Sequence, residues 1–342
     1  MEPISYRALG HRHWPQDAAI TFRGLDMKTT IVALSFCLVL GLGCKSSDEG
    51  NTESPGDSRP AWSTPPPSTI KAPERVVAFA DVHGDFEAAR AALQLAGLIN
   101  QDNQWIGGKT VAVQTGDQLD RGDGERAILD LFESLSAQAW QAGGGFYPLL
   151  GNHETMNVEL DFRYVTPGGW TDFADVTYDA ADPLIASYPA NERGRVAAFR
   201  PGGPYAMMLA GHNLTMMVGD TVFVHGGILS SHAETGLGVI NADVQAWMRG
   251  ETEAPDAWIH SDQSPVWTRD YSDAPGTSDC EELHATLSLL GANRMVVGHT
   301  VQSAANPACD DQVWLMDVGM AAHYGGSPAA LEIRGDAVTI LD

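Results

Sequence analysis

The sequence predicts an α/β fold, in which a largely parallel sheet is covered by helices. Two observations predict it. Between residues 75 and 150, short apolar runs alternate with segments of helical periodicity in the order strand, polar loop, helix, strand, the pattern of βαβ units. Several of the apolar runs end in a short motif that contains Asp or His. Because sites in such sheets form beyond the carboxyl ends of the strands, these motifs are expected to meet at one edge.

The first two βα units carry the clearest pattern. Residues 76–80 are apolar and predict a buried strand, and apolar residues recur at helical spacing through residues 86–96. The second unit repeats this design, with a strand at 110–114 and a helix that begins at Glu125. A third strand is predicted at 146–150, after a run of three glycines.

Residues 155–210 break this regularity. The segment is irregular and rich in Pro, Gly and aromatic residues. An ordinary surface insertion would account for it. A cap that walls a substrate cleft would account for it equally, because binding residues concentrate on loops carried by a rigid scaffold. The sequence leaves both interpretations open.

Beyond the insertion the pattern returns to strands. Residues 214–218 and 221–224 are joined through Gly219-Asp220 and predict a β-hairpin that leads to His225. Helices are predicted at 241–248 and 283–290, and strands at 294–297, 312–316, 329–334 and 338–341.

The charge balance limits the partners. The chain of 342 residues is long enough for one large α/β domain or two small ones. Its 20 basic and 44 acidic residues give a formal net charge of −24, which argues against nucleic acid or an anionic membrane as the main partner. A phosphate site in such a chain would need local positive charge, from metals or a few arginines.

The N-terminal segment is typical of targeting. An apolar run at 31–42 is too short to span a bilayer but suits the core of a signal peptide. Its end, Leu40-Gly-Leu-Gly-Cys44, resembles a bacterial lipoprotein signal, although Gly41 stands where leucine is usual. We therefore expect residues 1–26 to be an upstream extension and residues 27–44 a signal peptide. The protein would be exported to the periplasmic side and anchored through a lipid on Cys44, or otherwise be periplasmic or secreted.

The segment after Cys44 predicts a linker followed by one folded domain. Residues 45–74 are rich in Ser, Thr and Pro without periodicity, which predicts a flexible tether, and the domain is expected to span 75–342. Cys280 and Cys309 lie in that domain without the spacing of a zinc site. Export favours a disulfide between them, with two free thiols as the alternative.

Five short motifs carry the chemistry, and each follows an apolar run. They are Asp81-Val-His83-Gly84, Gly116-Asp-Gln-Leu-Asp-Arg-Gly122, Gly151-Asn-His-Glu154, His225-Gly-Gly227 and Gly298-His-Thr300. The two oxygens of the Asp117 carboxylate can each serve one cation, so this residue can bridge two metal ions. Asp120, followed by Arg121, suits a phosphate site with an adjacent proton donor. One such motif alone could be an acidic turn, but five in order argue against that.

The side chains at the strand ends predict a dinuclear metal site. Six potential ligands are delivered there: Asp81, His83, Asp117, Asn152, His225 and His299. This mixture of oxygen and imidazole suits Mn²⁺, Fe or Zn²⁺ better than Ca²⁺, and we expect Mn²⁺ foremost. Two metals about 3.5–4 Å apart can hold a hydroxide between them and clamp a phosphoryl group during in-line attack. The sequence contains no Cys-x5-Arg loop for a covalent alternative.

At these residues the chain resembles the metallophosphoesterase superfamily, in particular the phosphoprotein phosphatases. The family signature is GDxHG, GDxxDRG, GNHE, HGG and a late histidine, and the one departure is Ala80 for the first glycine, a position that holds no ligand. Pro265-Val-Trp-Thr-Arg269, Gly298-His-Thr300 and Asp317-Val-Gly-Met320 are more similar to the bacterial Shewanella-like branch than to the eukaryotic Ser/Thr enzymes. The resemblance covers residues 75–342. It implies a calcineurin-like fold: a two-sheet sandwich flanked by helices, with the dinuclear site at a sheet edge.

The resemblance also implies a role for each matched residue. Asp81, His83 and Asp117 would hold one metal, and Asp117, Asn152, His225 and His299 would hold the other. His153 would be the general acid, oriented by Asp120, because the intrinsic pKa of histidine lies near neutrality. Arg121 would grip the phosphate, with Arg269 as a second clamp. Glu154 is expected to orient the ligand loop, Tyr324 to line the cleft, and Trp267 to be core beneath the Arg269 loop.

The resemblance implies a metal-dependent phosphatase acting on phosphorylated protein or peptide, with phosphotyrosine favoured by the Shewanella-like branch. One alternative is a hydrolase of dinucleoside polyphosphates or small phosphate esters. An alternative of another class is a non-catalytic metal-binding surface protein. The sequence does not fix the oligomeric state.

Overall fold

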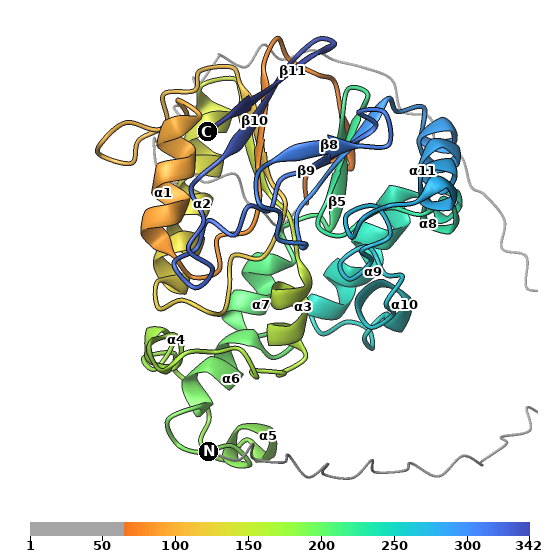
Figure 1. Cartoon of the computed structure of the whole chain (residues 1–342). Helices are drawn as coiled ribbons and strands as arrows, with labels where there is room; N and C mark the ends of the chain where they lie inside the picture. Colours follow the sequence, from red (N-terminus) through yellow and green to blue (C-terminus); the bar gives the residue numbers. More distant parts are fainter. Residues whose placement is uncertain (1–64) are drawn as a thin grey trace, which may run out of the picture. The chain divides into compact units, whose positions relative to one another are not determined.

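The computed structural model describes residues 65–342 (Figure 1). The predictions for the upstream extension, the signal peptide, the lipid anchor at Cys44 and most of the linker concern residues outside this range. Within residues 65–342, no helix has both the length and the apolar character needed to cross a membrane.

One sheet is built mainly from the first βα units. Its strand order is β11-β10-β2-β3-β4. The bounds are β2 (Val76–Phe79), β3 (Val111–Gln114), β4 (Gly145–Pro148), β10 (Ala330–Arg334) and β11 (Ala337–Leu341). Strands β2, β3 and β4 are parallel, and their last residues Phe79, Gln114 and Pro148 lie side by side. The motifs that follow these strands therefore emerge at one edge, as the sequence predicts.

The second sheet delivers the later motifs. Its strand order is β1-β5-β6-β7-β9-β8. The bounds are β1 (Thr69–Ile70), β5 (Thr215–Val218), β6 (Thr221–Val224), β7 (Arg294–Val297), β8 (Asn306–Ala308) and β9 (Val313–Leu315). Strands β5 and β6 form the predicted hairpin, while β6, β7 and β9 are parallel. Both sheets are mixed, so the expectation of one largely parallel sheet holds only for their central strands.

The two sheets pack face to face. Alternate residues of β2 and β3, such as Val76 and Val113, join Phe223 and Val296 of the other sheet in one buried cluster. The intervening residues face outward and are equally buried, beneath α1 (Phe86–Leu95) and α2 (Glu125–Gln141). Because helices cover the outer face, these strands are apolar on both sides. The two-sheet sandwich flanked by helices is confirmed.

Helices on the other outer face complete the sandwich. They are α8 (Ser230–Thr235), α9 (Leu237–Met248) and α11 (Thr277–Leu290), while α10 (Asp256–Ile259) lies between α9 and α11 in the chain. Leu283 and Leu287 of α11 pack on Val222 and Val297 of the second sheet. A disulfide joins Cys280 in the first turn of α11 to Cys309 beyond β8, so the disulfide is the alternative that the structure contains.

The insertion is more ordered than its sequence suggests. Residues 155–210 hold the end of α3 (Asn152–Val158) and four further helices: α4 (Pro167–Asp172), α5 (Pro183–Ala186), α6 (Arg193–Phe199) and α7 (Pro204–Leu209). Phe173 and Phe199 pack in a buried cluster with Leu119 and Leu129 of the βα unit. The insertion is thus anchored to the scaffold beside the Gly116–Gly122 motif.

The structure differs from the predicted linker at its end. Thr69 and Ile70 form β1, which pairs in parallel with Met217 and Val218 of β5. Ile70 also packs against the inter-sheet core, which explains why this apolar residue in a polar stretch joins the sheet. The folded domain therefore begins before residue 75.

Candidate active site

The strand ends bring all six predicted ligands into one buried group. Asp81 follows β2, Asp117 follows β3, His225 follows β6 and His299 follows β7, and each is buried. His83 and Asn152, also buried, come from the same loop as Asp81 and from the first position of α3.

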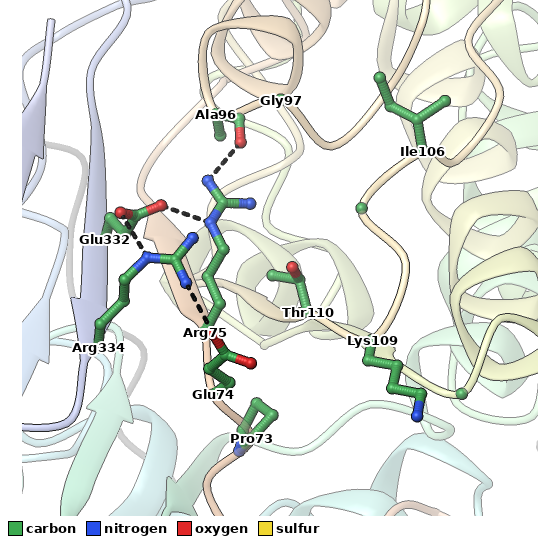
Figure 2. A pocket seen from close by; sticks show the side chains of 12 residues that line it. Pro73, Glu74, Arg75, Ala96, Gly97, Ile106, Lys109, Thr110, Glu332 and Arg334 are labelled. Atoms are coloured by element: carbon green, nitrogen blue, oxygen red, sulfur yellow. Dashed lines mark hydrogen bonds and ion pairs between the residues drawn. The ribbon is translucent and has the colours of Figure 1, made fainter.

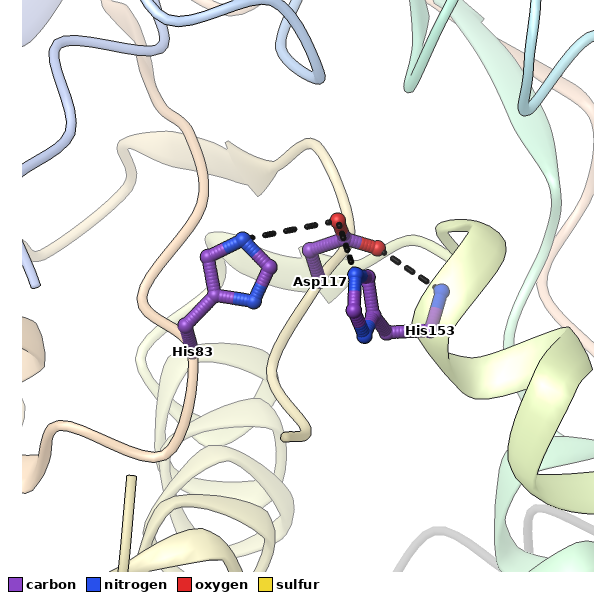
Figure 3. A group of neighbouring side chains, drawn as sticks. All are labelled: His83, Asp117 and His153. Atoms are coloured by element: carbon purple, nitrogen blue, oxygen red, sulfur yellow. Dashed lines mark hydrogen bonds and ion pairs between the residues drawn. The ribbon is translucent and has the colours of Figure 1, made fainter. Parts of the chain in front are cut away.

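The Asp117 carboxylate lies at the centre of this group. Its Oδ2 atom lies 3.7 Å from Nε2 of His83 and 3.2 Å from Nε2 of His225. Figure 3 shows His83 and His153 on either side of this carboxylate; Nε2 of His153 lies 3.9 Å from Oδ2. Two groups of donor atoms therefore share Asp117, one with His83 and His153 and one with His225 and His299. Each of these two groups could hold a divalent metal ion.

Asp81 and Asn152 add one oxygen-bearing side chain to each of the two groups of donor atoms. Oδ2 of Asp81 lies 3.8 Å from Nε2 of His83, and both carboxylate oxygens accept from the backbone N–H of His299 at 3.2 Å. On the other side, Oδ1 of Asn152 lies 2.9 Å from Nε2 of His225. The remaining ring nitrogens of two histidines face backbone carbonyls: Nδ1 of His83 lies 3.2 Å from the Leu119 oxygen and Nδ1 of His225 lies 2.9 Å from the Thr115 oxygen. These contacts fix the ring orientations.

The backbone of the site is held in an uncommon conformation. Five site residues outside glycine have positive φ: His83 (41°), Asp117 (59°), Asp120 (67°), Arg121 (64°) and His299 (67°). Such conformations cost free energy and persist where the surrounding structure fixes them. The loops also cross closely, since a Cβ atom on Gly122 would lie 2.4 Å from the backbone of Gly84. This contact explains the glycines that end the first two motifs.

The electrostatics of the group favour bound cations. Burial raises the pKa of the Asp81 carboxyl well above its usual range, and the neighbouring Asp317 raises it further. Burial likewise raises the pKa of Asp317 to about 6, and its buried Oδ2 atom has no hydrogen-bond partner. Burial lowers the pKa of His83 to about 3. Burial also lowers the pKa of His299 well below its usual range, and the charges of His225 and Arg269 lower it further. Neutral imidazoles beside buried carboxyl groups are a donor set that suits divalent metal ions.

Asp117 and His225 shift the pKa of each other in opposite directions. Burial opposes the charge of Asp117, but His225 and His153 hold the pKa of its carboxyl well below its usual range. Burial also opposes the charge of His225, whereas Asp117 and Asp81 raise the pKa of its imidazole to about 9. These shifts favour opposite charges on the two groups, since Nε2 of His225 and Oδ2 of Asp117 lie 3.2 Å apart.

His153 and Asp120 form the predicted pair. Nδ1 of His153 lies 2.6 Å from Oδ2 of Asp120, and both side chains are buried. The other carboxylate oxygen of Asp120 accepts from Nδ2 of Asn157 at 3.2 Å. With Nδ1 engaged, Nε2 is the ring nitrogen of His153 left for chemistry in the cleft that this residue lines.

Two arginines line the same cleft. The cleft has a volume of about 300 Å³. The Arg121 guanidinium lies between the rings of Tyr164 and Tyr324, 5.0 and 5.2 Å from their centroids. Nη1 of Arg269 donates to the backbone oxygen of His299 at 3.1 Å and to Oγ1 of Thr300 at 2.8 Å. Both predicted phosphate clamps therefore reach the cleft.

Aromatic side chains complete the walls. Tyr324 lines the cleft, as expected, and the insertion adds Tyr164, which the sequence did not single out as a site residue. Trp267 both lines the cleft and packs against the buried cluster, with Nε1 donating to the Ile259 oxygen at 2.8 Å. It is therefore not only core. Because Tyr164 belongs to residues 155–210, the cap interpretation of the insertion gains support.

A larger cavity, of about 690 Å³, lies where β2, β3 and β4 begin, at their opposite ends from the metal ligands (Figure 2). Three of its charged side chains pair with one another: Glu332 accepts from Nε of Arg75 and, at 3.0 Å, from Nε of Arg334. It holds none of the motif residues, so its size does not make it the active site.

Comparisons with known proteins agree with this geometry. Residues 74–303 match the model of the calcineurin-like phosphoesterase family. The Shewanella-like protein phosphatase 2 of Arabidopsis thaliana is 41% identical in an alignment of length 299 that covers 78% of this chain and 76% of that protein. The Shewanella-like protein phosphatase 1 of Plasmodium berghei is 28% identical, over 75% of this chain and 70% of that protein.

Solved structures give the same result. A cold-active protein tyrosine phosphatase superposes with a TM-score of 0.68 and 28% identity, over 82% of this chain and 79% of that one. The enzyme described as the cold-active protein-tyrosine phosphatase of a psychrophilic Shewanella species gives a TM-score of 0.64 and 26% identity, over 82% and 84% of the chains. The chain therefore belongs to the calcineurin-like metallophosphoesterases, a family that implies divalent metal ions, and is a metal-dependent phosphatase. Within that family it belongs to the Shewanella-like protein phosphatases.

Proposed function

We propose that the chain dephosphorylates phosphoproteins, with a preference for phosphotyrosine. The observation that carries the proposal is the arrangement of Arg121 between Tyr164 and Tyr324, directly beside the buried Asp117 group. A guanidinium between two rings offers its N–H groups to a phosphate, while the rings offer apolar area to an aryl group. The tyrosine phosphatase activity in the names of the structural neighbours supports the same substrate class.

The proposed metal centre uses the residues named from the sequence. Asp81, His83 and Asp117 would hold one ion, and Asp117, Asn152, His225 and His299 would hold the other, with Mn²⁺ foremost and Fe or Zn²⁺ as alternatives. His153 could also offer Nε2 to the first ion, but its contact with Asp120 favours a role in proton transfer. When bound, the two ions would neutralise charge on the phosphate and make water a better nucleophile.

The side chains of the cleft would then divide the remaining work. Arg121 and Arg269 bind phosphate oxygens from two sides of the cleft. Asp120 holds Nδ1 of His153, so that Nε2 can donate a proton to the oxygen of the departing tyrosine or serine. A donated proton matters because an alkoxide or phenoxide leaves poorly without one.

The proposed location remains that of an exported protein with a lipid on Cys44. The segment at 27–44 supports it, and so does the Cys280–Cys309 disulfide, since disulfides persist in oxidising compartments. Metabolic labelling with a palmitate analogue should mark the wild-type chain and not a Cys44→Ala variant. Equal labelling of both would remove the anchor from the proposal.

The substrate is tested with residues 65–342, stripped of metal and reloaded with Mn²⁺. Phosphate release is compared between paired phosphotyrosine and phosphoserine peptides, with a dinucleoside polyphosphate alongside. The expected result is a kcat/KM at least about tenfold higher for the phosphotyrosine peptide than for the phosphoserine peptide. This ratio corresponds to a difference of about 1.4 kcal/mol in transition-state stabilisation. Faster cleavage of the polyphosphate would replace the protein substrate with a nucleotide. Inactivity with both ions bound would instead favour a non-catalytic protein.

A further inference from the structure

Arg195 is an arginine buried inside the insertion. It lies on α6, its side chain is fully buried, and the rings of Phe162, Phe173 and Phe199 surround it at 5.7, 5.1 and 5.0 Å. A guanidinium removed from water in this way is costly unless acceptors surround it. No motif in the sequence marks Arg195, which stands as a single charge before the apolar run Val196–Phe199.

The guanidinium of Arg195 finds those acceptors on the loop of the active site. Nη2 donates to Oε1 of Glu125 at 2.8 Å and to Oδ1 of Asp120 at 3.4 Å, while Nη1 donates to the other oxygen of Glu125. Nη2 and Nε also donate to Oδ1 of Asn157, at 2.7 and 3.0 Å. Nη1 reaches the backbone oxygen of Gly169 at 2.9 Å. Arg195 thus joins the insertion to the first turn of α2 and to Asp120.

Arg195 and its partners Glu125 and Asn157 supply the hydrogen bonds of Asp120 besides its contact with His153. The backbone N–H of Asp120 donates to Oε1 of Glu125 at 2.5 Å, and Oδ1 accepts from Asn157, which itself accepts from Arg195. The one further contact, from Oδ2, goes to His153 at 2.6 Å. Asp120 has a φ of 67°, so these hydrogen bonds hold a conformation that the backbone does not favour by itself.

The charges of these buried groups also make the loop of Asp120 depend on Arg195. Burial opposes the charge of Glu125 and raises the pKa of its carboxyl, while Arg195 acts in the opposite direction. Glu125 and Asp120 are both fully buried, so without Arg195 two carboxylates would face each other away from water.

We infer that Arg195 is a positioning residue for the Asp120–His153 pair, through which the insertion controls proton donation to the leaving group. The inference rests on the proposed role of His153. The hydrogen-bond partners of Arg195 include none of the six predicted metal ligands, and Arg195 does not line the cleft. It fixes the carboxylate that orients the imidazole.

The experiment uses leaving groups of different basicity. Dinitrophenyl phosphate releases a weakly basic phenoxide that needs no proton, whereas phenyl phosphate releases one that does. Arg195→Lys keeps the charge but loses the fork of donors. It should lower kcat on phenyl phosphate by about 10- to 100-fold, since general acids contribute roughly 10²–10⁴-fold in all. On dinitrophenyl phosphate we expect a change below about threefold. Equal losses on the two substrates would overturn the inference.

Two companion variants separate this inference from the proposed function. His153→Asn alone should show the same dependence on the leaving group; if it does not, His153 is not the proton donor and the proposal itself fails. If His153→Asn shows it and Arg195→Lys does not, only the present inference fails. In the double variant, Arg195→Lys should cause no further loss on phenyl phosphate. Additive losses would contradict an action through His153.

A matched control comes from Arg126, the residue next to Glu125 in α2. Arg126 also joins α2 to the insertion, with Nη1 donating to the Asp172 oxygen at 3.0 Å, but the structure gives it no contact with Asp120. Arg126→Lys should leave the ratio of the two rates unchanged, and an equal shift there would overturn the inference. If Arg195→Lys does not fold, Glu125→Gln tests the same connection. It removes the charge that holds the guanidinium and should slow the hydrolysis of phenyl phosphate more than that of dinitrophenyl phosphate. Equal losses on the two substrates would contradict the inference.

Discussion

The carboxylate of Glu154 accepts a hydrogen bond from the backbone N–H of Asp117 at 2.8 Å. The same carboxylate accepts from three further N–H groups, those of Gln118 and Leu119 at 2.9 and 3.1 Å and that of Gly151 at 2.7 Å. Glu154 is fully buried. One side chain thus holds the loop that carries the bridging carboxylate, which is the orienting role expected from the sequence.

Replacing Glu154 should therefore destabilise the domain. Glu154→Gln puts an amide N–H₂ group in place of one oxygen, where it would face two backbone donors. We expect a loss of about 2–4 kcal/mol in the free energy of unfolding, because buried donors would lose their acceptor. Urea unfolding measures it. Glu87→Gln, on an exposed glutamate of α1, is the control and should cost under about 1 kcal/mol. Equal stability of the two variants would remove this role from Glu154.

Asp117 itself is expected to hold both metal ions. Asp117→Asn removes the negative charge at the centre of the site and replaces one of its two oxygen donors with an amide N–H₂ group. The number of bound ions should therefore fall below two, and turnover should fall by about 100-fold or more. Elemental analysis of the dialysed protein gives the stoichiometry, and circular dichroism checks the fold. Asp102→Asn, in an exposed loop, is the matched control. Two ions and near-normal turnover in Asp117→Asn would end the assignment of a dinuclear site.

The position of the site could be predicted because its signals are local. A short apolar run followed by Asp or His indicates a buried strand and a polar strand end without knowledge of the rest of the chain. The register of β2, β3 and β4 then follows from parallel pairing, so Asp81, Asp117 and Asn152 meet. The assignment of His225 and His299 to a second sheet came only through the family resemblance.

The insertion could not be predicted in the same way, because its order depends on distant contacts. The contact of Arg195 with Asp120 joins two segments that share no sequence pattern. Part of the signal was nevertheless present: Thr166-Pro167 and Asp182-Pro183 are caps followed by proline at the first helical position, and both begin short helices. Helices of four to six residues leave too little periodicity to detect.

The disulfide should contribute to stability without taking part in the chemistry. Cys280 and Cys309 are separated by 29 residues, a loop for which closure in the unfolded chain predicts about 3–4 kcal/mol. The Cys280→Ser/Cys309→Ser double variant should lose about this free energy of unfolding and keep its kcat, since neither residue lines the cleft. Urea unfolding and phosphate release are measured on the same preparation. A large loss of kcat at temperatures where the variant is folded would show that the disulfide also shapes the active site.

His232 should make stability depend on pH. Nδ1 of its imidazole accepts from the backbone N–H of Leu229 at 3.1 Å, which requires the neutral ring, and its ring packs on Trp258. Burial lowers the pKa of His232 from 6.5 to about 4, while Glu282 acts in the opposite direction. Between these two pH values the unfolded chain binds a proton that the folded protein excludes, so stability falls as the pH falls.

The expected size follows from the same shift. Between pH 7 and pH 5 the wild type should lose about 1–2 kcal/mol more of its free energy of unfolding than His232→Gln, which cannot titrate there. Urea unfolding at the two pH values gives this difference directly. His284→Gln, on an exposed histidine of α11, removes an ionisable ring without burial and should follow the wild type. If His232→Gln loses as much stability as the wild type, protonation of His232 does not control the acid sensitivity of the domain.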